Sequence, residues 1–415
     1  MPDPMPSPSV QGSVRHRVAL IAGEASGDLL GADLAHGLRR LLPGVELAGV
    51  AGPAMRRAGV TAWHDCESLA VMGLAEVLAH LPRLLRLRRT LARQLMDWQP
   101  DLVVGIDAPD FNLGLEARLK RQGVRTAHYV SPSVWAWRAS RAARIGRSCD
   151  RVLCLFPMEP PIYADYGVDA RFVGHPLAQR FAMRPDRAAA RARLGLPEGA
   201  RWMALLPGSR RGELRRLVAP FLHAAALVRR TFPEFAVLVP VTGPRSRAVF
   251  EQLLRHTLAS APARGAPDRA SASELLDLQA RLRVVERDSH TVLEAAEIGL
   301  IASGTAALEA MLARLPMVVG YRIAPLTHAL VRGLRLMRTH VYSLPNILAG
   351  RELVRECMQG DCEPSTLAAA LLELLCDPQA PERLLPEYDR LHRSLHAPEP
   401  MAAAQALVEL LERGR

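Results

Sequence analysis

The stretch VALIAGEASGDLLGADL, residues Val18–Leu34, decides the fold class. An apolar run from Val18 to Ala22 meets a glycine turn, and a pattern typical of a helix follows. A strand, a glycine turn and a helix in this order predict a βα unit, whose turn can bring backbone N–H groups to an anion. Glu24 and Asp28 lie in this turn, where two carboxylates do not suit a phosphate. The identity of the ligand is therefore the first functional question.

Short apolar runs alternate with helical patterns along the first half of the chain, which predicts parallel βαβ units. These runs are Val18–Ala22, Val45–Val50, Leu102–Ile106, Thr126–Val130, Val152–Leu155 and Arg171–Val173. A second alternation follows, and its runs are Trp202–Leu206, Ala236–Val239, Leu282–Val285, Ile298–Ala302 and Met317–Gly320. The predicted fold class is therefore α/β, with two Rossmann-like halves and a ligand cleft between them.

Composition along the chain suggests the domain limits. Residues 1–13 are rich in Pro and Ser and are expected to form a disordered lead, and residues 14–180 form the first domain. Residues 181–200 hold two prolines and many Arg and Ala residues, which predicts a linker with one short helix. Residues 201–385 form the second domain, and residues 386–415 form a C-terminal helix.

The charge of the chain is strongly basic. Its 415 residues include 53 Lys plus Arg and 42 Asp plus Glu, for a formal net charge of +11. This indicates either a solvated arginine surface or an acidic partner, such as nucleic acid, a phosphorylated ligand or an anionic membrane. No stretch of about 18 residues is apolar enough to span a bilayer. The six cysteines form no C-x-x-C pair, which predicts reduced thiols rather than a zinc site or a disulfide framework.

The glycines of the first turn argue against a dinucleotide. Gly23, Gly27 and Gly31 are spaced G-x-x-x-G-x-x-x-G rather than G-x-G-x-x-G. The second apolar run also lacks the terminal acid that holds a dinucleotide ribose, so NAD is not predicted. Glu24 and Asp28 have two interpretations. Either they gain from the dipole at a helix N-terminus, or they accept hydrogen bonds from hydroxyl groups such as those of a sugar.

Two acids follow the run Leu102–Ile106 in the segment DAPDFN. Strand ends in α/β sheets face the ligand crevice, so Asp107 and Asp110 could bind a metal or act as a base. The alternative is a capping role for Asp110 or Asn112 at the helix that follows. Because Pro109 makes the turn stiff, we favour the functional interpretation.

The second half contains two further strand–turn–helix units that suit a phosphate. In PGSR, small residues allow close backbone approach, and Arg210 next to Ser209 can bind phosphate oxygens with its planar guanidinium. The segment SGTAALE repeats the design, and its turn is formed by Ser303, Gly304 and Thr305. Glu309 could accept hydrogen bonds from a ribose diol. The alternatives are an N-cap role for Ser303 and a surface position for Glu309.

The segment DCESLAVMGLAEVLAHLPRLLRLRR is first apolar and then rich in arginine. A core helix has a similar pattern, but leucines interleaved with arginines also fit an interfacial helix on anionic lipid. The predicted membrane patch consists of Leu69, Val71, Met72, Leu74, Val77, Leu78, Leu81, Arg83, Arg86 and Arg88.

These segments together resemble the lipid-A-disaccharide synthase family, the glycosyltransferases that join two acylated glucosamines. The matching pieces, in family order from Gly23 to Gly350, are AGEASGD, VMGLAEVL, DAPDFN, YVSPSVWAWR, VGHPL, LPGSR, ASGTAALE and SLPNILAG. The Pro-rich lead, the Ala/Ser/Pro-rich segment 258–276 and the second arginine of PGSRRGE depart from the family pattern.

The resemblance implies a GT-B fold in which the last helix crosses back to the first domain. It implies UDP-2,3-diacylglucosamine as donor and 2,3-diacylglucosamine 1-phosphate as acceptor, joined by a β-1,6 bond with inversion and release of UDP. The expected enzyme is a metal-independent hexosyltransferase without a cofactor, peripheral on the inner face of the inner membrane. Nucleic acid is not an expected partner, and a homodimer stays open.

Matching motifs also imply roles for single residues. The resemblance makes Asp110 the base, with Asp107 as the second candidate. The residues implied to hold the donor are Ser209, Arg210, Ser303, Gly304, Thr305 and Glu309, while Asn346 positions donor or acceptor. The acceptor-side residues are Gly23, Glu24, Ser26 and Asp28. Two alternatives remain: a UDP-sugar 2-epimerase of the same fold, and a non-catalytic protein of the membrane surface.

Overall fold

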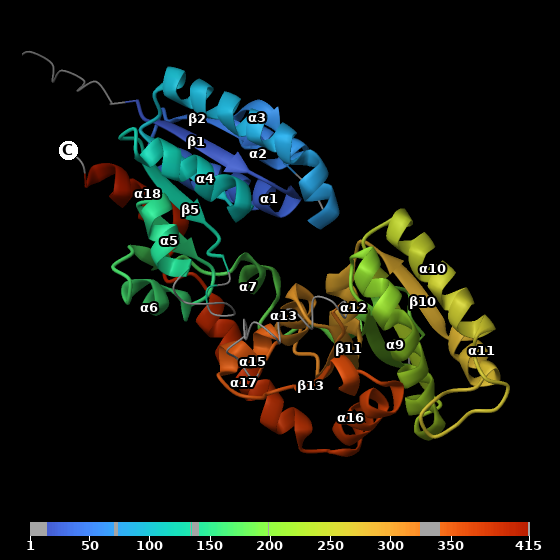
Figure 1. Cartoon of the computed structure of the whole chain (residues 1–415). Helices are drawn as coiled ribbons and strands as arrows, with labels where there is room; N and C mark the ends of the chain where they lie inside the picture. Colours follow the sequence, from blue (N-terminus) through green and yellow to red (C-terminus); the bar gives the residue numbers. More distant parts are fainter. Residues whose placement is uncertain are drawn as a thin grey trace, which may run out of the picture. The chain divides into compact units, whose positions relative to one another are not determined.

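The chain folds into two compact units (Figure 1). The computed structural model describes residues 15–69, 74–132, 134, 141–197, 199–323 and 341–413, with only the backbone described for residues 74–81. Unit 1 comprises Met1–Pro176 and Ala397–Arg415, and unit 2 comprises Leu177–His396. The first unit is therefore built from two separate pieces of the chain.

Unit 1 contains a seven-stranded parallel sheet in the order β3-β2-β1-β4-β5-β6-β7. Its strands are β1 Arg17–Ala22, β2 Glu46–Ala51, β3 Thr61–Asp65, β4 Leu102–Ile106, β5 Arg125–Tyr129, β6 Arg151–Cys154 and β7 Ala170–Phe172. Strands β2 and β3 lie on one side of β1, and strands β4 to β7 lie on its other side, so the direction of winding reverses at β1. Because parallel crossovers are right-handed, this reversal places helices on both faces of the sheet.

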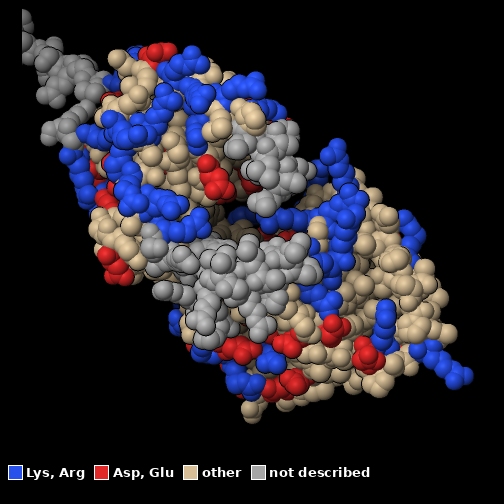
Figure 2. Space-filling model, viewed as in Figure 1, with Lys and Arg blue, Asp and Glu red and all other residues tan. Residues whose placement is uncertain are grey.

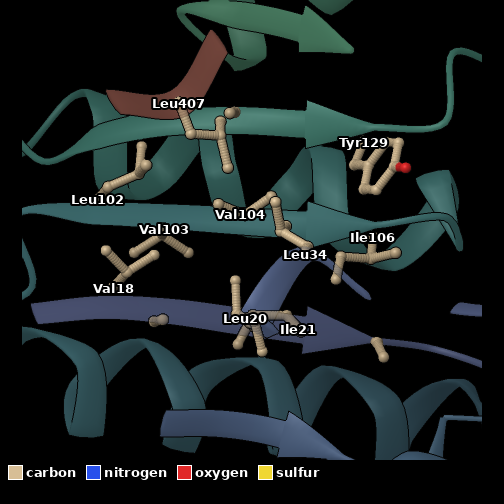
Figure 3. Packing of buried hydrophobic residues seen from close by; sticks show 14 of the residues in the cluster. Val18, Leu20, Ile21, Leu34, Leu102, Val103, Val104, Ile106, Tyr129 and Leu407 are labelled. Atoms are coloured by element: carbon tan, nitrogen blue, oxygen red, sulfur yellow. The ribbon is translucent and has the colours of Figure 1, made fainter. Parts of the chain in front are cut away.

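The helices of unit 1 cover both faces of this sheet. They are α1 Ala25–Leu41, α2 Pro53–Arg57, α3 Leu74–Trp98, α4 Pro109–Lys120, α5 Arg141–Ser148, α6 Glu159–Ala164 and α18 Ala402–Glu412, with α7 Pro176–Arg180 at the boundary. Helix α4 packs between α3 and α5, while α1 packs with α2 and α18. Strand β4 is consequently buried along its whole length, and Figure 3 shows Leu102, Val104 and Ile106 among the core side chains.

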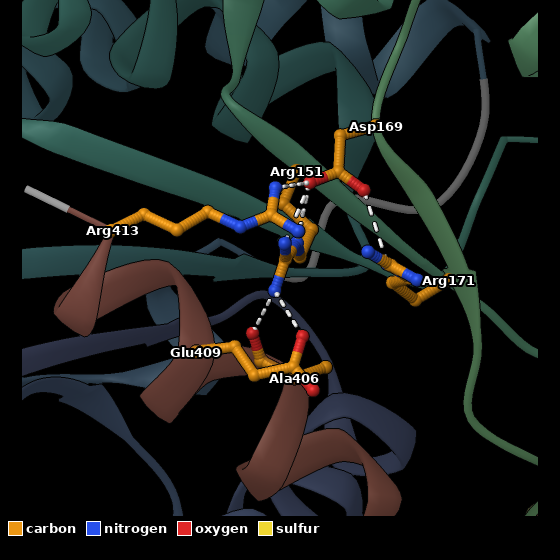
Figure 4. Close-up of polar contacts among 6 residues, drawn as sticks. All are labelled: Arg151, Asp169, Arg171, Ala406, Glu409 and Arg413. Atoms are coloured by element: carbon orange, nitrogen blue, oxygen red, sulfur yellow. Dashed lines mark hydrogen bonds and ion pairs between the residues drawn. The ribbon is translucent and has the colours of Figure 1, made fainter.

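The last helix joins unit 1 through a buried arginine (Figure 4). The Arg151 guanidinium is fully buried and donates to the backbone carbonyl of Ala406 in α18. Its Nη2 atom also donates to Asp169 Oδ2 at 2.6 Å, and Arg413 reaches the same carboxylate at 3.0 Å. Because a buried charge is costly without partners, these contacts fix α18 on the sheet.

Unit 2 contains a six-stranded parallel sheet in the order β10-β9-β8-β11-β12-β13. Its strands are β8 Arg201–Leu206, β9 Phe235–Val241, β10 Leu282–Glu286, β11 Ile298–Ala302, β12 Met317–Tyr321 and β13 Arg355–Met358. Its helices are α8 Arg187–Arg193, α9 Arg211–Thr231, α10 Pro244–Ala259, α11 Ala272–Ala280, α12 Ser289–Ala295, α13 Thr305–Leu312, α15 Leu344–Ala349, α16 Pro364–Cys376 and α17 Ala380–Leu395. The strand order again reverses at the centre, between β8 and β11.

Candidate active site

Two turns of unit 1 lie side by side at the carboxyl ends of the neighbouring strands β1 and β4. Ala22 pairs with Ile106 in the sheet, so the residues that follow them meet. A Cβ atom added at Gly23 would lie only 2.3 Å from the Cβ atom of Ala108. Only glycine permits this approach, which brings the turn that carries Glu24 against the turn that carries Asp107.

The turn after β4 holds a strained backbone. Asp107 and Ala108 have φ angles of 54° and 45°, in the left-handed region that non-glycine residues rarely adopt. Asn112 braces the turn, because its buried side-chain amide donates to the carbonyls of Asp107 at 2.8 Å and Ile21 at 3.2 Å. Asp110 is exposed in the first turn of α4, so its carboxylate is accessible to a substrate.

A buried hydrogen-bonded pair of side chains lies behind this turn, and the sequence did not predict it. Glu116 Oε1 and His128 Nδ1 are 2.8 Å apart, and both side chains are almost completely buried. Burial raises the pKa of the Glu116 carboxyl. A Cβ atom at Gly105 would lie 2.0 Å from Glu116 Oε1, so this glycine leaves the space that the pair occupies. The pair fixes α4 against β5.

Another ionisable group lies where β6 ends in unit 1. Glu159 is buried at the start of α6, and its Oε2 atom accepts a hydrogen bond from the backbone N–H of Phe156 at 3.1 Å. Burial raises the pKa of Glu159 to about 7. The ring centroids of Phe156 and His175 are 5.1 Å apart. Burial lowers the pKa of His175 to about 4. Neither Glu159 nor His175 was predicted to have a role from the sequence.

The first turn separates the two acids that the sequence analysis grouped together. Glu24 precedes α1 with an exposed side chain, and Ser26 is exposed as well, so both remain candidates for contact with a hydroxylated ligand. Asp28 is buried, and its carboxylate accepts hydrogen bonds from the backbone N–H groups of Gly52, Ala54 and Met55 at 2.8–3.0 Å. The prediction of an acceptor contact was wrong for Asp28, because its oxygens serve the N-terminus of α2.

Unit 2 contains a cavity of about 640 Å³ at the carboxyl ends of its strands. The turns after β8, β9 and β11 line it, and each of these turns leads into a helix. The predicted residues that line this cavity are Ser209, Arg210, Ser303, Gly304, Thr305 and Glu309. Thr242, Ser246 and Arg287 line it too, although the sequence analysis did not single them out. Thr242 and Arg287 directly follow strands β9 and β10, and Ser246 lies in the first turn of α10, which follows β9; these positions were the available signal.

The PGSR turn differs from the phosphate cradle that the sequence suggested. The Glu213 carboxylate accepts hydrogen bonds from the backbone N–H groups of Ser209 at 3.1 Å and Arg210 at 3.2 Å. These donors at the N-terminus of α9 therefore already serve a carboxylate of the chain itself. The Arg210 side chain is 80% exposed, and its Nη1 atom lies 3.9 Å from Glu213 Oε1.

Among the described residues, no carboxylate of the chain accepts hydrogen bonds from the turn after β11. Gly304 is the N-cap of α13 with a φ of 144°, and no side chain caps this helix. One turn later, Ser289 Oγ donates to Glu309 Oε2 at 3.5 Å. Burial raises the pKa of Glu309, and Arg180 opposes this effect. The pair of a free helix N-terminus and a half-buried carboxylate can hold a phosphate and a diol on one wall.

Asn346 does not line the cavity of unit 2, so its predicted direct contact with donor or acceptor finds no support in the packing. The side chain is completely buried in unit 2. Its amide nitrogen donates to Val354 O at 2.8 Å and Glu356 Oε1 at 2.7 Å, and its oxygen accepts from the N–H groups of Leu353 and Val354. All four hydrogen-bonding positions of the amide are used, which makes Asn346 a structural brace.

The predicted membrane patch is only partly described. Val71 and Met72 lie outside the described residues, and the side chains of Leu74, Val77, Leu78 and Leu81 in α3 are not described. Leu69 is buried in the core of unit 1, so its assignment to a membrane surface was wrong. Arg83 and Arg86 are exposed, while Arg88 is half-buried against Gly114 of α4.

Among the residues that the structure describes, no group of three or more His, Cys, Asp or Glu side chains is arranged to hold a metal ion. No described helix is both long and apolar enough to cross a membrane.

The sequence as a whole matches known proteins. A family model described as lipid-A-disaccharide synthetase matches residues 18–263 and 266–408. A lipid-A-disaccharide synthase from Xanthomonas campestris pv. campestris (strain 8004) is 51% identical over 98% of this chain and 89% of its own length. One from Xylella fastidiosa (strain M12) is 49% identical over 96% of this chain and 98% of its own length.

Solved structures share the architecture at low sequence identity. The UDP-GlcNAc 2-epimerase of Neisseria meningitidis, bound to UDP-GlcNAc, covers 96% of this chain and all of its own, with a TM-score of 0.58 and 12% identity. The calicheamicin glycosyltransferase CalG4 covers 97% of this chain and 99% of its own, with a TM-score of 0.54 and 17% identity. This likeness confirms the predicted GT-B fold with two Rossmann-like domains and shows the fold alone.

Proposed function

The chain belongs to the lipid-A-disaccharide synthetase family, and we propose from this premise how it acts as a glycosyltransferase of lipid A biosynthesis. It transfers 2,3-diacylglucosamine from UDP-2,3-diacylglucosamine to 2,3-diacylglucosamine 1-phosphate. The products are a β-1,6-linked disaccharide 1-phosphate and UDP. The observation that carries this proposal is that the family match spans both the Asp107–Asp110 turn of unit 1 and the cavity of unit 2.

The donor binds in the cavity of unit 2. The free N-terminus of α13, at Gly304 and Thr305, offers backbone N–H groups and a positive dipole to the diphosphate. Glu309 accepts hydrogen bonds from the ribose hydroxyls, since its carboxylate lies one turn along the same helix. Arg210 supplies a cation whose planar guanidinium suits phosphate oxygens.

The acceptor binds at the two adjacent turns of unit 1. Glu24 and Ser26 expose hydrogen-bonding side chains that suit sugar hydroxyl groups. Asp110 acts as the base that removes the proton from the acceptor 6-hydroxyl, and Asp107 is the alternative. The acceptor oxygen then attacks the anomeric carbon of the donor, and the bond from this carbon to the diphosphate breaks.

The reaction inverts the anomeric configuration and needs no metal ion. A single displacement requires one base for the hydroxyl and a positive environment for the departing UDP, and helix N-termini with arginine side chains provide that environment. Turnover should therefore survive EDTA. Strong inhibition that Mg²⁺ or Mn²⁺ reverses would contradict metal independence.

The enzyme works as a peripheral protein on the inner face of the inner membrane, because both substrates carry acyl chains. Exposed arginines support this placement: Arg83 and Arg86 in α3, and Arg141, Arg144 and Arg147 in α5. Figure 2 shows basic side chains over much of the visible face of unit 1. Each basic residue near an anionic surface contributes on the order of 1 kcal/mol, so attachment should be reversible and sensitive to salt.

Mass spectrometry of the products tests the reaction. The enzyme is incubated with the UDP-sugar in the presence and absence of the lipid acceptor. We expect a disaccharide 1-phosphate and UDP only when the acceptor is present. A UDP-sugar epimer formed without acceptor would instead support the alternative, a 2-epimerase of the same fold.

A further inference from the structure

Arg287 lines the cavity of unit 2 in an unusual backbone conformation. It follows β10 with a φ of 59°, in the left-handed region that long side chains rarely adopt. Its backbone N–H donates to Val241 O at 2.8 Å, and the next residue, Asp288, caps α12 by accepting from the N–H of Thr291 at 3.1 Å. Structure on both sides therefore imposes this conformation, as is typical of functional positions.

The neighbouring turn leaves room for the Arg287 side chain. A Cβ atom added at Gly243 would lie 3.5 Å from Arg287 Nε and 3.7 Å from its Nη2 atom. The guanidinium thus lies along the Gly243 turn, which precedes α10 and carries the cavity-lining residues Thr242 and Ser246. Arg287 is an exposed residue, and its guanidinium is accessible to a ligand in the cavity.

The charge of Arg287 has no partner among the residues that the structure describes, since no carboxylate there forms an ion pair with it. Arg247 nearby differs, because its guanidinium contacts both Glu251 at 2.8 Å and Glu286 at 3.2 Å. The two carboxylates that line the cavity are also engaged, Glu213 by backbone N–H groups of the PGSR turn and Glu309 by Ser289. A guanidinium without a counter-ion in such a cavity suits a bound anion.

We infer that Arg287 binds the phosphate groups of the nucleotide, as a second cation of the cavity beside Arg210. This inference rests on the proposed function, which places UDP here. Glu213 occupies the N–H groups of the PGSR turn and also lies 3.9 Å from the Arg210 guanidinium, so part of the positive charge on this side of the cavity is already neutralised. Arg287, which has no ion-pair partner among the described residues, adds its charge to that of Arg210 and of the α13 N-terminus, both when the donor binds and when UDP departs with its negative charge.

Calorimetric titration of the full chain with UDP, UMP and uridine tests this role. The variant Arg287→Gly removes the guanidinium and suits the left-handed backbone, so it should remain folded in a thermal melt. We expect its affinity for UDP to fall about tenfold or more, its affinity for UMP to fall less, and its affinity for uridine to stay unchanged. The salt dependence of UDP binding should also become weaker.

Arg245→Ala is the matched control, because Arg245 is an exposed arginine of α10 that does not line the cavity. It should bind all three ligands as the unmodified chain does. An unchanged UDP affinity in Arg287→Gly would overturn the inference, and so would an equal loss of uridine binding, which would make Arg287 a base contact. Failure of the unmodified chain to bind UDP would instead overturn the proposed function.

Discussion

Replacing Gly23 by Ala should separate the two turns on which the proposed acceptor site depends. The new Cβ atom would lie 2.3 Å from the Cβ atom of Ala108, whereas carbon atoms in contact lie about 3.5–4.0 Å apart. The turns must therefore move apart by roughly 1 Å or more. Overpacking of this kind costs about 1–3 kcal/mol of unfolding free energy. For a domain of roughly 150–250 residues, each kcal/mol lowers the melting temperature by about 2–4 °C.

The effect on turnover should exceed the effect on stability. Asp107 and Asp110 flank the displaced Ala108, and a misplacement of about 1 Å can lower the rate by about 10². The rate of disaccharide formation measures this loss. UDP affinity, measured by calorimetry, should stay unchanged, because the nucleotide cavity lies in unit 2.

A second substitution provides the rescue. In the double variant Gly23→Ala, Ala108→Gly the clashing Cβ atom of residue 108 is absent, and the closest remaining atom is its Cα at 3.7 Å. Glycine also suits the left-handed backbone at this position. Most of the stability and turnover should return. Gly360→Ala is the matched control, because a Cβ atom there meets nothing within 4 Å. Full turnover in Gly23→Ala, or no recovery in the double variant, would refute the reasoning.

Three further substitutions test the proposed base, the buried Glu159 and the arginines of α3. Asp110→Asn should lower turnover by about 10²–10⁴ while UDP still binds, and near-normal kcat in this variant together with a loss in Asp107→Asn would make Asp107 the base. Burial raises the pKa of Glu159 from 4.5 to about 7, so its stabilising protonated form is lost as the pH rises through 7. Glu159→Gln should therefore have a free energy of unfolding about 3 kcal/mol higher than that of the unmodified chain above pH 8, as measured by denaturant titration. This difference should vanish below pH 4.5, and equal stability of the two proteins at pH 8 would contradict the prediction. The double variant Arg83→Glu, Arg86→Glu should reduce the fraction of protein that sediments with anionic vesicles at low salt. The control double variant Arg255→Glu, Arg264→Glu should reduce this fraction less. Equal reductions in the two variants would place the membrane contact elsewhere.

Apolar runs predicted the central strands and the edge strands β7 and β10, but they missed the opposite edge strand of each sheet, β3 and β13. The run in Ile298–Ala302 is buried on both faces, and its sequence is accordingly apolar throughout. Strand β3, with the sequence TAWHD, and strand β13, with the sequence RECM, are short and lie at sheet edges. These two strands bury little surface, and their sequences carry polar and charged residues that hide the apolar signal.

Some residues of the candidate site could be predicted from the sequence, and others could not. The position of Asp110 after a strand could be predicted, because topology places strand ends at the ligand edge. The burial of Asp28 and Asn346 could not, since their hydrogen-bond partners lie in other segments: Gly52, 24 residues from Asp28, and Val354, beyond the end of the helix that carries Asn346. A polar residue in a motif can serve a ligand or brace a loop, and only the hydrogen-bond partners distinguish these roles.

The return of α18 to unit 1 has a consequence for synthesis on the ribosome. The fully buried Arg151 finds its partners in α18 only after residues 177–396 have been translated. At about 5–20 residues per second, the nascent first unit waits on the order of tens of seconds with this arginine and one face of α1 uncovered. Unit 2 is continuous in sequence and can complete its fold during that interval. The chain therefore favours an order in which its second unit matures first, and the incomplete first unit is the stage at which chaperones would be needed.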